Sequence, residues 1–228
     1  VMSSRGVRQG DPLGSFYHAL NMHTVLESLR DLPELQAARV RNDIVQSAYH
    51  DDCHMLICGD SAEEVVHLLT TVWGSLPKIL SRTDGRLSNK KSKILTLSGE
   101  VHSQLQPHLD RLGFDPRNVL LWNPDDKATE VGIDVLGCPI GSDQFVMKHV
   151  ESLVHKRDAG VMSKLRSTMF IKKPHSLCVA EAIMNHCCAQ SIYHTLRMVD
   201  PTLASSAAQL MDDMIMRTTA SYHVDAAG

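Results

Sequence analysis

The sequence predicts an α+β protein in which a mixed helix-and-strand part precedes an all-helical part. Residues 13–30 and the region after residue 143 repeat apolar side chains at helical spacing. Residues 43–58 instead form two short apolar runs around a polar turn, which is typical of a β-hairpin. The change in pattern predicts a mixed part at residues 1–142 and a helical part at residues 143–228.

The composition narrows the class of protein. Of 228 residues, 43% are hydrophobic and 21% are charged, which excludes a disordered chain. The net charge of -3 differs from the basic excess of most nucleic-acid-binding domains, so such binding would need local basic clusters. The six cysteines form no CxxC pair, which indicates a reducing compartment rather than disulfides or zinc. No apolar run is long enough to span a bilayer, so we expect a soluble intracellular protein without membrane contact.

The mixed part begins with a predicted helix. Asp11-Pro12 favours a helix start, because Asp accepts from free amides and Pro fits the first turn, and the pattern continues to about Arg30. Ser61 and Glu64 form a capping box. The helix that they open is expected to run toward Leu76 and to end at, or just before, Pro77.

The rest of the chain is predicted from its turn residues and periodicity. Residues 94–97 favour a strand, residues 102–112 a helix stopped at Gly113, and residues 131–140 a strand pair around Gly137. The Asp-, Asn- and Pro-rich residues 114–130 are predicted to be a surface insertion. Helices are expected over residues 144–166, 174–198 and 201–218.

The predicted turn Tyr49-His50-Asp51-Asp52 carries the clearest chemistry. Two adjacent carboxylates at a hairpin tip repel one another unless a cation compensates them. Hard cations such as Mg²⁺ prefer these oxygens, and two metals about 4 Å apart are used in nucleotidyl transfer. A solvated polar turn is the alternative, because Asp is common in turns.

A second pattern lies before the first helix, at residues 5–13 (RGVRQGDPL). Gly10 permits a ligand to approach the backbone closely, and free helix-start amides with Arg5 and Arg8 suit a phosphate. The alternative is an ordinary loop-to-helix junction with surface arginines.

Two further clusters are possible sites. His50, Cys53 and His54 offer zinc-type ligands, but side chains on adjacent strand residues alternate faces and so converge poorly. A dense basic cluster could contact a phosphate backbone, with a solvated loop as the alternative. Its members are Arg82, Arg86, Lys90, Lys91 and Lys93.

Four strings in this order resemble the reverse transcriptases of non-LTR retrotransposons. Residues 5–13 resemble the family's glutamine-glycine helix motif, and residues 49–52 its metal-binding hairpin. Residues 87–92 (LSNKKS) resemble its lysine motif, and residues 135–138 (VLGC) its Leu-Gly turn at the primer grip. The resemblance covers nearly the whole chain and implies a partial palm, with an antiparallel sheet and packed helices, at residues 1–142 and a thumb at residues 143–228.

The resemblance also implies roles for particular residues. Asp51 and Asp52 would bind metal, and Lys91, or Lys93 if the register differs, would assist the leaving pyrophosphate. Arg8, Gln9, Gly10 and Tyr49 would contact nucleotide or template, and Leu136 and Gly137 the primer. The implied partners are an RNA template, a DNA primer, deoxynucleotide triphosphates and two Mg²⁺ ions, in the nucleus.

Some features depart from the family. The chain starts at Val1, so we expect it to be cut from a longer polypeptide and to lack the fingers and the strand with the first catalytic Asp. By itself it is then expected to be inactive. His50 stands where a small residue is usual, Ser88 where Asn is usual, and Gly14 where Ser is common. A non-catalytic retroelement relic that binds nucleic acid or protein is therefore an alternative, and an RNA-templated RNA polymerase is another.

Overall fold

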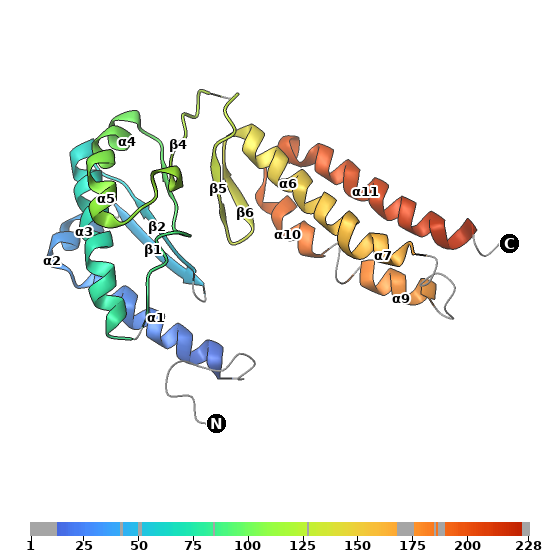
Figure 1. Cartoon of the computed structure of the whole chain (residues 1–228), viewed down its shortest axis with the longest axis horizontal. Coiled ribbons are helices and arrows are strands. Elements are labelled where there is room, and N and C mark those ends of the chain that lie inside the picture. Colours follow the sequence, from blue (N-terminus) through green and yellow to red (C-terminus); the bar gives the residue numbers. More distant parts are fainter. Residues whose placement is uncertain are drawn as a thin grey trace. The chain divides into compact units, whose positions relative to one another are not determined.

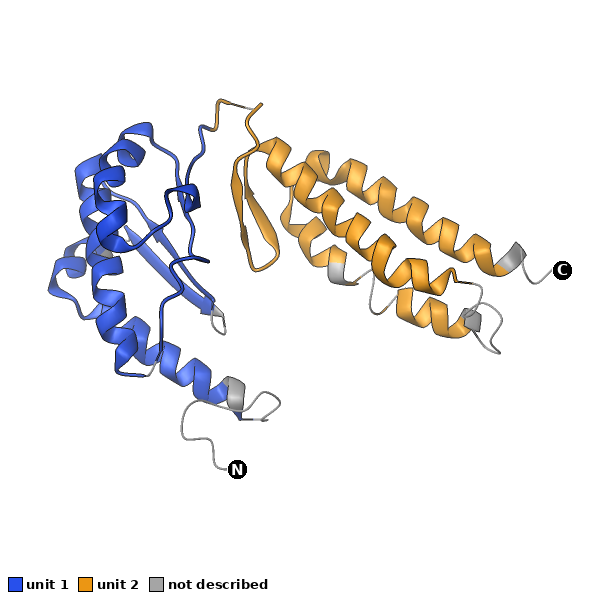
Figure 2. Cartoon of the chain, in the orientation of Figure 1, with its two compact units in different colours: residues 1–123 blue, residues 124–228 orange. Residues whose placement is uncertain are grey.

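The structure, a computed structural model, describes residues 13–41, 43–49, 52–83, 85–126, 128–167, 176–184, 186 and 190–224. The chain divides into two compact units, Val1–Asn123 and Pro124–Gly228 (Figure 2). Helices and small antiparallel and parallel sheets are both present, so the predicted α+β class is confirmed (Figure 1). The sequence boundary predicted near residue 142 falls inside the second unit, and the division into palm and thumb stays a prediction.

The first unit consists of helices around two short two-stranded sheets. Strands β1 and β2 pair antiparallel, and strands β3 and β4 pair parallel. In chain order its elements are α1 (Gly14–Arg30), α2 (Pro33–Val40), β1 (Ile44–Tyr49), β2 (Asp52–Ile57), α3 (Ala62–Ser81), β3 (Ile94–Thr96), α4 (Gly99–Leu105), α5 (Leu109–Leu112) and β4 (Val119–Leu121), with short 3-10 turns at Gln106–His108 and Pro116–Asn118.

Two apolar clusters hold the first unit together. In one, Leu29 of α1, Leu35 of α2 and Val72 of α3 are almost fully buried beside β1. The other joins α3 to α4, α5 and β4. Trp73 contacts both clusters, and its indole Nε1 donates to the Leu112 carbonyl at 3.1 Å. The two small sheets are therefore positioned by one helix, α3, which packs against both cores.

Helix α3 begins as predicted but ends later. Ser61 Oγ accepts from the Glu64 amide at 3.2 Å, while the Glu64 carboxylate accepts from the Asp60 amide at 2.9 Å, one residue before the expected partner. The predicted end at Pro77 is wrong, because the helix contains Pro77 and continues to Ser81. A proline inside a helix costs about 3 kcal/mol. Leu76 and Ile79 on either side are each 6% exposed, and burying such side chains contributes about 1.5–3 kcal/mol each.

The predicted surface insertion at residues 114–130 is wrong in its first part. Phe114 is 4% and Val119 is 5% exposed, and Val119 begins β4, which pairs with β3. The ring of Phe114 lies 4.2 Å from that of Trp73 between centroids. A three-residue strand is too short to show a periodic pattern among turn residues, so only its tertiary pairing identifies it.

The second unit is a hairpin followed by helices. Strands β5 (Gly132–Val135) and β6 (Cys138–Gly141) form the predicted strand pair. The helices are α6 (Asp143–Arg157), a π-helical turn (Asp158–Met162), α7 (Ser163–Leu165), α9 (Ser176–Ile183), α10 (Gln190–Met198) and α11 (Pro201–Val224). Among the described residues, no helix is long and apolar enough to cross a membrane.

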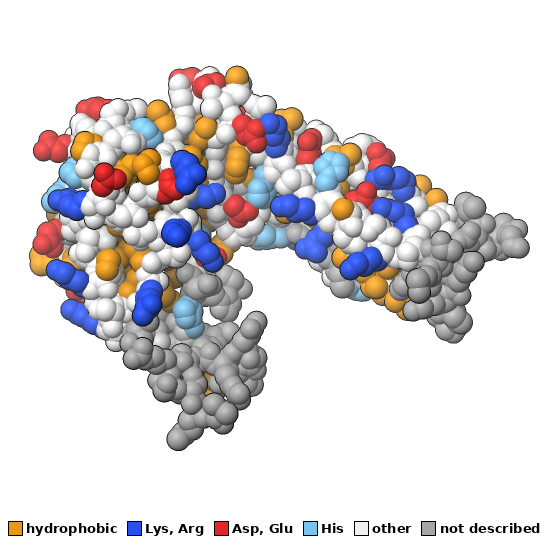
Figure 3. Space-filling view, in the orientation of Figure 1, with side chains coloured by type: hydrophobic (Ala, Val, Ile, Leu, Met, Phe, Trp, Pro, Cys, Tyr) orange, Lys and Arg blue, Asp and Glu red, His pale blue; other side chains and the backbone are white. Residues whose placement is uncertain are grey.

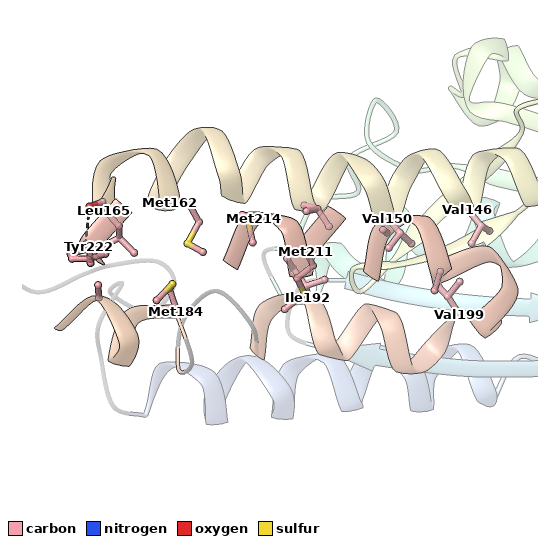
Figure 4. Packing of buried hydrophobic residues seen from close by; sticks show 14 residues of the cluster. Val146, Val150, Met162, Leu165, Met184, Ile192, Val199, Met211, Met214 and Tyr222 are labelled. Carbon is pink, nitrogen blue, oxygen red and sulfur yellow. Dashed lines mark hydrogen bonds between the residues drawn. The ribbon is translucent and has the colours of Figure 1, made fainter. Parts of the chain in front are cut away.

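One apolar cluster fills the helical unit (Figure 4). Val146, Val150 and Val154 recur every four residues along α6 and are all buried, as the helical periodicity predicts. Met214 of α11 is fully buried in the same cluster. The Tyr222 hydroxyl donates to the Leu165 carbonyl at 2.8 Å, which ties the end of α11 to α7.

Candidate metal and nucleic-acid site

The β1–β2 hairpin presents the acidic string at its tip. The ladder runs from Ile44 opposite Ile57 to Tyr49 opposite Asp52. His50 and Asp51 connect these last paired residues and lie outside the described residues, as does the Tyr49 side chain. The predicted strands are confirmed, and Asp52 is the first residue of β2 rather than part of the turn.

The two faces of this hairpin differ. Ile44, Met55 and Ile57 share one face and belong to the apolar cluster below it. Strand alternation puts Asp52 on the opposite face together with Val45 and Leu56, which are 54% and 60% exposed. The Asp52 side chain is exposed as well. The carboxylate that the sequence assigns to metal therefore belongs to the face that the core does not cover.

The residues beside Asp52 suit a hard cation better than zinc. Cys53 and His54 alternate faces of β2, and desolvation raises the pKa of the Cys53 thiol, which disfavours the thiolate that zinc needs. The described residues contain no group of three or more His, Cys, Asp or Glu side chains arranged for a metal. Asp52 supplies a hard oxygen ligand of the kind that Mg²⁺ prefers, and the remaining ligands would have to come from Asp51 or from other groups.

The predicted nucleotide-binding string precedes α1. Arg8, Gln9 and Gly10 lie outside the described residues, as does the predicted Asp11-Pro12 helix start. Helix α1 itself begins at Gly14, and Leu13 precedes it without a side-chain cap. The helix that the pattern predicted to Arg30 ends there.

Lys91 lies on the segment between α3 and β3. Its amide donates to the Ser88 carbonyl at 2.9 Å, and its side chain is exposed, like those of Lys90 and Lys93. The described hydrogen bonds and ion pairs do not join Lys91 to Asp52. The sequence strings therefore lie on separate segments of the first unit, of which Tyr49 and Asp52 are brought together by direct pairing.

The β5–β6 hairpin has a well-defined tip in the second unit. Val135 pairs with Cys138, and the two residues between them have positive φ, 55° for Leu136 and 81° for Gly137. Successive positive φ values are the geometry of a type I′ turn, which matches strand twist and favours Gly at the second position. Leu136 is 45% exposed, so an apolar side chain is presented at the tip.

Three side chains that the sequence did not single out secure this tip. Asp134 Oδ1 accepts from the Gly137 amide at 2.7 Å, and Thr195 Oγ1 of α10 donates to the Gly137 carbonyl at 3.0 Å. His149 Nε2 of α6 lies 3.2 Å from Asp134 Oδ2. Asp134 could have been found from its spacing, since Asp commonly bonds an amide in its own turn. Thr195 carries no local signal, because its partner is far away in the sequence.

A thiol and an imidazole also meet beside this hairpin. Cys138 Sγ lies 3.7 Å from His194 Nε2. Burial, and secondarily the charge of Asp134, raise the pKa of the Cys138 thiol. The contact therefore holds a protonated thiol at neutral pH and does not provide an activated nucleophile.

Comparison with protein-family models, curated proteins and solved structures finds no match to this chain.

Proposed function

We propose that the chain is part of an RNA-directed DNA polymerase of the reverse transcriptase type. The observation that carries the proposal is the fold of the Tyr49–Asp52 string. Its first and last residues are the final pair of a β-hairpin, so the two residues between them are confined to the hairpin tip. Adjacent carboxylates at such a tip favour a bound cation, as two-metal nucleotidyl transfer requires.

The order of the elements supports the proposal. The glutamine-glycine string leads into α1, the acidic string joins β1 and β2, and the lysine string precedes β3. The Leu-Gly string forms the tip of the β5–β6 hairpin, after which the chain is helical. Under this proposal residues 1–142 are part of a palm, residues 143–228 are a thumb, and the protein acts in the nucleus.

Each residue of the site has a role in the proposed reaction. Asp51 and Asp52 would hold Mg²⁺, which lowers the barrier by activating the primer hydroxyl and stabilising the leaving oxygen. Gln9 and Gly10 would position the incoming nucleotide, with Arg8 and Tyr49 beside it. Lys91 would stabilise the charge on the departing pyrophosphate. Leu136 and Gly137 would support the primer end, and the positive φ of an exposed Leu136 is the kind of backbone strain that clusters at ligand contacts.

The test is primer extension on an RNA template with Mg²⁺, using the longest polypeptide that contains this chain. We expect deoxynucleotide incorporation that disappears in Asp51→Asn. Glu27→Gln is the matched control, because it removes one negative charge from an exposed site on α1. A folded, nucleic-acid-binding polypeptide that extends no primer would contradict the proposal.

A non-catalytic nucleic-acid- or protein-binding role is the second candidate. The observation that favours it is that the described residues contribute one carboxylate, Asp52, whereas Mg²⁺ takes about six oxygen ligands. His50 would also compete with a cation when it is protonated. The same assay separates the candidates, because the binding role predicts retained binding with no incorporation in either Asp51→Asn or the parent.

A further inference from the structure

The segment between α3 and β3 concentrates positive charge in a chain whose net charge is -3. Between residues 78 and 93, six Lys or Arg residues stand against one acid, Asp84, which lies outside the described residues. None of the described hydrogen bonds or ion pairs neutralises the cations at positions 82, 86, 90, 91 and 93. Lys and Arg side chains gather on the face of the first unit that is in view in Figure 3.

The cations of this segment all occupy exposed positions. Arg86, Lys90, Lys91 and Lys93 are exposed, whereas the residues that alternate with them are half-buried. Those half-buried residues are Leu87, Asn89 and Ser92. Leu87 packs against the apolar cluster of α1, α2 and α3. The segment thus has an inner row that anchors it and an outer row of charges spread along its length.

Two asparagine side chains fix the backbone of the segment. Asn89 Nδ2 donates to the Leu112 carbonyl at 3.2 Å, and Asn118 Nδ2 donates to the Lys90 carbonyl at 3.1 Å. Gly113 is needed for the first contact, because a Cβ there would lie 2.5 Å from Asn89 Nδ2. Gly113 also has a φ of 72°, which favours glycine.

The turn inside the segment is closed by its own hydrogen bonds. The Ser92 amide and hydroxyl donate to the Ser88 carbonyl at 3.0 and 3.1 Å. The lysines therefore project from a backbone that is ordered before any ligand arrives. A preformed site does not lose ordering entropy on binding, so its affinity is higher than that of a flexible lysine tail.

We infer that residues 86–93 form a preformed binding site for the phosphodiester backbone of a nucleic-acid strand, with Asn89 and Asn118 as positioning residues. The row of charges along an extended segment suits a polyanion with repeated phosphates better than one small anion, which would need converging donors. The inference deepens the proposed function, on which it rests for the class of ligand.

The first test measures binding of a 20-nucleotide oligo(U) to the full 228-residue chain by fluorescence anisotropy at several salt concentrations. On single strands the salt slope falls by about 0.7 per lost phosphate contact, so Lys90→Ala/Lys93→Ala should lower it by about 1.4. Between 50 and 200 mM salt the parent would then lose about sevenfold more affinity than this variant. Oligo(dT) should give the same change, because the contact is to the backbone.

The matched control is Arg30→Ala/Lys148→Ala, which removes the same charge from exposed sites that already form ion pairs. It should keep the parental slope. The inference is overturned if Lys90→Ala/Lys93→Ala binds with the parental affinity and slope, or if the control lowers the slope equally.

The second test asks whether Asn118 acts through the lysines. Asn118→Ala keeps the net charge and should weaken oligo(U) binding about threefold to fivefold, because the loosened segment must be ordered on binding. On the Lys90→Ala/Lys93→Ala background this loss should vanish, since contacting groups in one network are non-additive. Equal losses on both backgrounds would show a general structural effect and contradict the positioning role.

These results are separable from the polymerase assay. If binding depends on the segment but the longer polypeptide extends no primer, the binding site stands and the proposed reaction falls. If primer extension and oligo(U) binding are both unchanged in Lys90→Ala/Lys93→Ala, the proposed reaction stands and this inference falls.

Discussion

The two antiparallel hairpins of this protein are held by different means. The strands of β1–β2 are six residues long, and one face of this hairpin packs on the apolar cluster of the first unit. The strands of β5–β6 are four residues long, and side chains of α6 and α10 secure the tip by polar contacts. The comparison teaches that packing sets the position of the first hairpin, whereas individual bonds set the tip conformation of the second.

The largest expected effect comes from close packing beneath the second hairpin. A Cβ at Gly132 would overlap the Phe145 ring of α6 and the Ile140 carbonyl of β6. Gly132→Ala should therefore lower the free energy of unfolding by about 2–3 kcal/mol. The control is Gly160→Ala, whose Cβ would meet no atom within 4 Å. Thermal or urea unfolding measures both, and equal stabilities would show that the hairpin is not closely packed on α6.

Removing one polar contact at the second tip should have a smaller effect. Thr195 is 3% exposed, and Thr195→Val leaves the Gly137 carbonyl without its hydroxyl donor. A loss of about 1–2 kcal/mol is expected, and Thr195→Ser should restore most of it. If the serine variant is as unstable as the valine variant, the methyl group rather than the hydrogen bond secures the tip.

Relieving strain at the same tip should act in the opposite direction. Leu136 has a φ of 55°, where a leucine costs about 1–2 kcal/mol and Asn much less. Leu136→Asn should raise the free energy of unfolding by about 1 kcal/mol. In the proposed enzyme it should also weaken primer extension, because the apolar tip is lost. A variant that is stabilised without any loss of extension would remove Leu136 from the proposed site.

The smallest effect concerns one thiol in each hairpin. Desolvation raises the pKa of Cys53, and burial with Asp134 raises that of Cys138, so both should react with iodoacetamide more slowly at neutral pH than exposed Cys58. Because the folded pKa lies above the unfolded one, these thiols contribute stability that is lost as pH rises above about 9. Peptide mass spectrometry after timed alkylation measures the rates. Equal rates at all three positions would contradict the desolvation.

Much of the fold could be predicted because its determinants are local. The capping box at Ser61, the stop at Gly113 and both hairpins follow from turn chemistry and alternation, and the structure confirms them. The continuation of α3 through Pro77 and the formation of β4 depend on tertiary packing that no local pattern reveals. For the same reason the sequence indicated Gly137 at the second tip but missed Thr195, which reaches it from another helix.

The candidate site is less evenly predicted. Tyr49 and Asp52 are brought together as the sequence expects, and the Lys91 segment is exposed. The sequence identified its lysines but not Asn89 and Asn118, which fix their backbone through contacts between distant segments. The assignments of Asp51, Arg8, Gln9 and Gly10 fall on residues outside the described part of the chain and stay predictions.

The central claim is that the tip of β1–β2 binds a divalent cation, and paramagnetic broadening by Mn²⁺ tests it most directly. In the full chain we expect weak, millimolar binding that broadens the amide signals of Ala48 and Cys53 before those of the β5–β6 hairpin. Asp51→Asn and Asp52→Asn should abolish this broadening and change stability by no more than about 0.5 kcal/mol, as for surface substitutions. Broadening that persists in both variants, or its absence from the parent, would contradict the account.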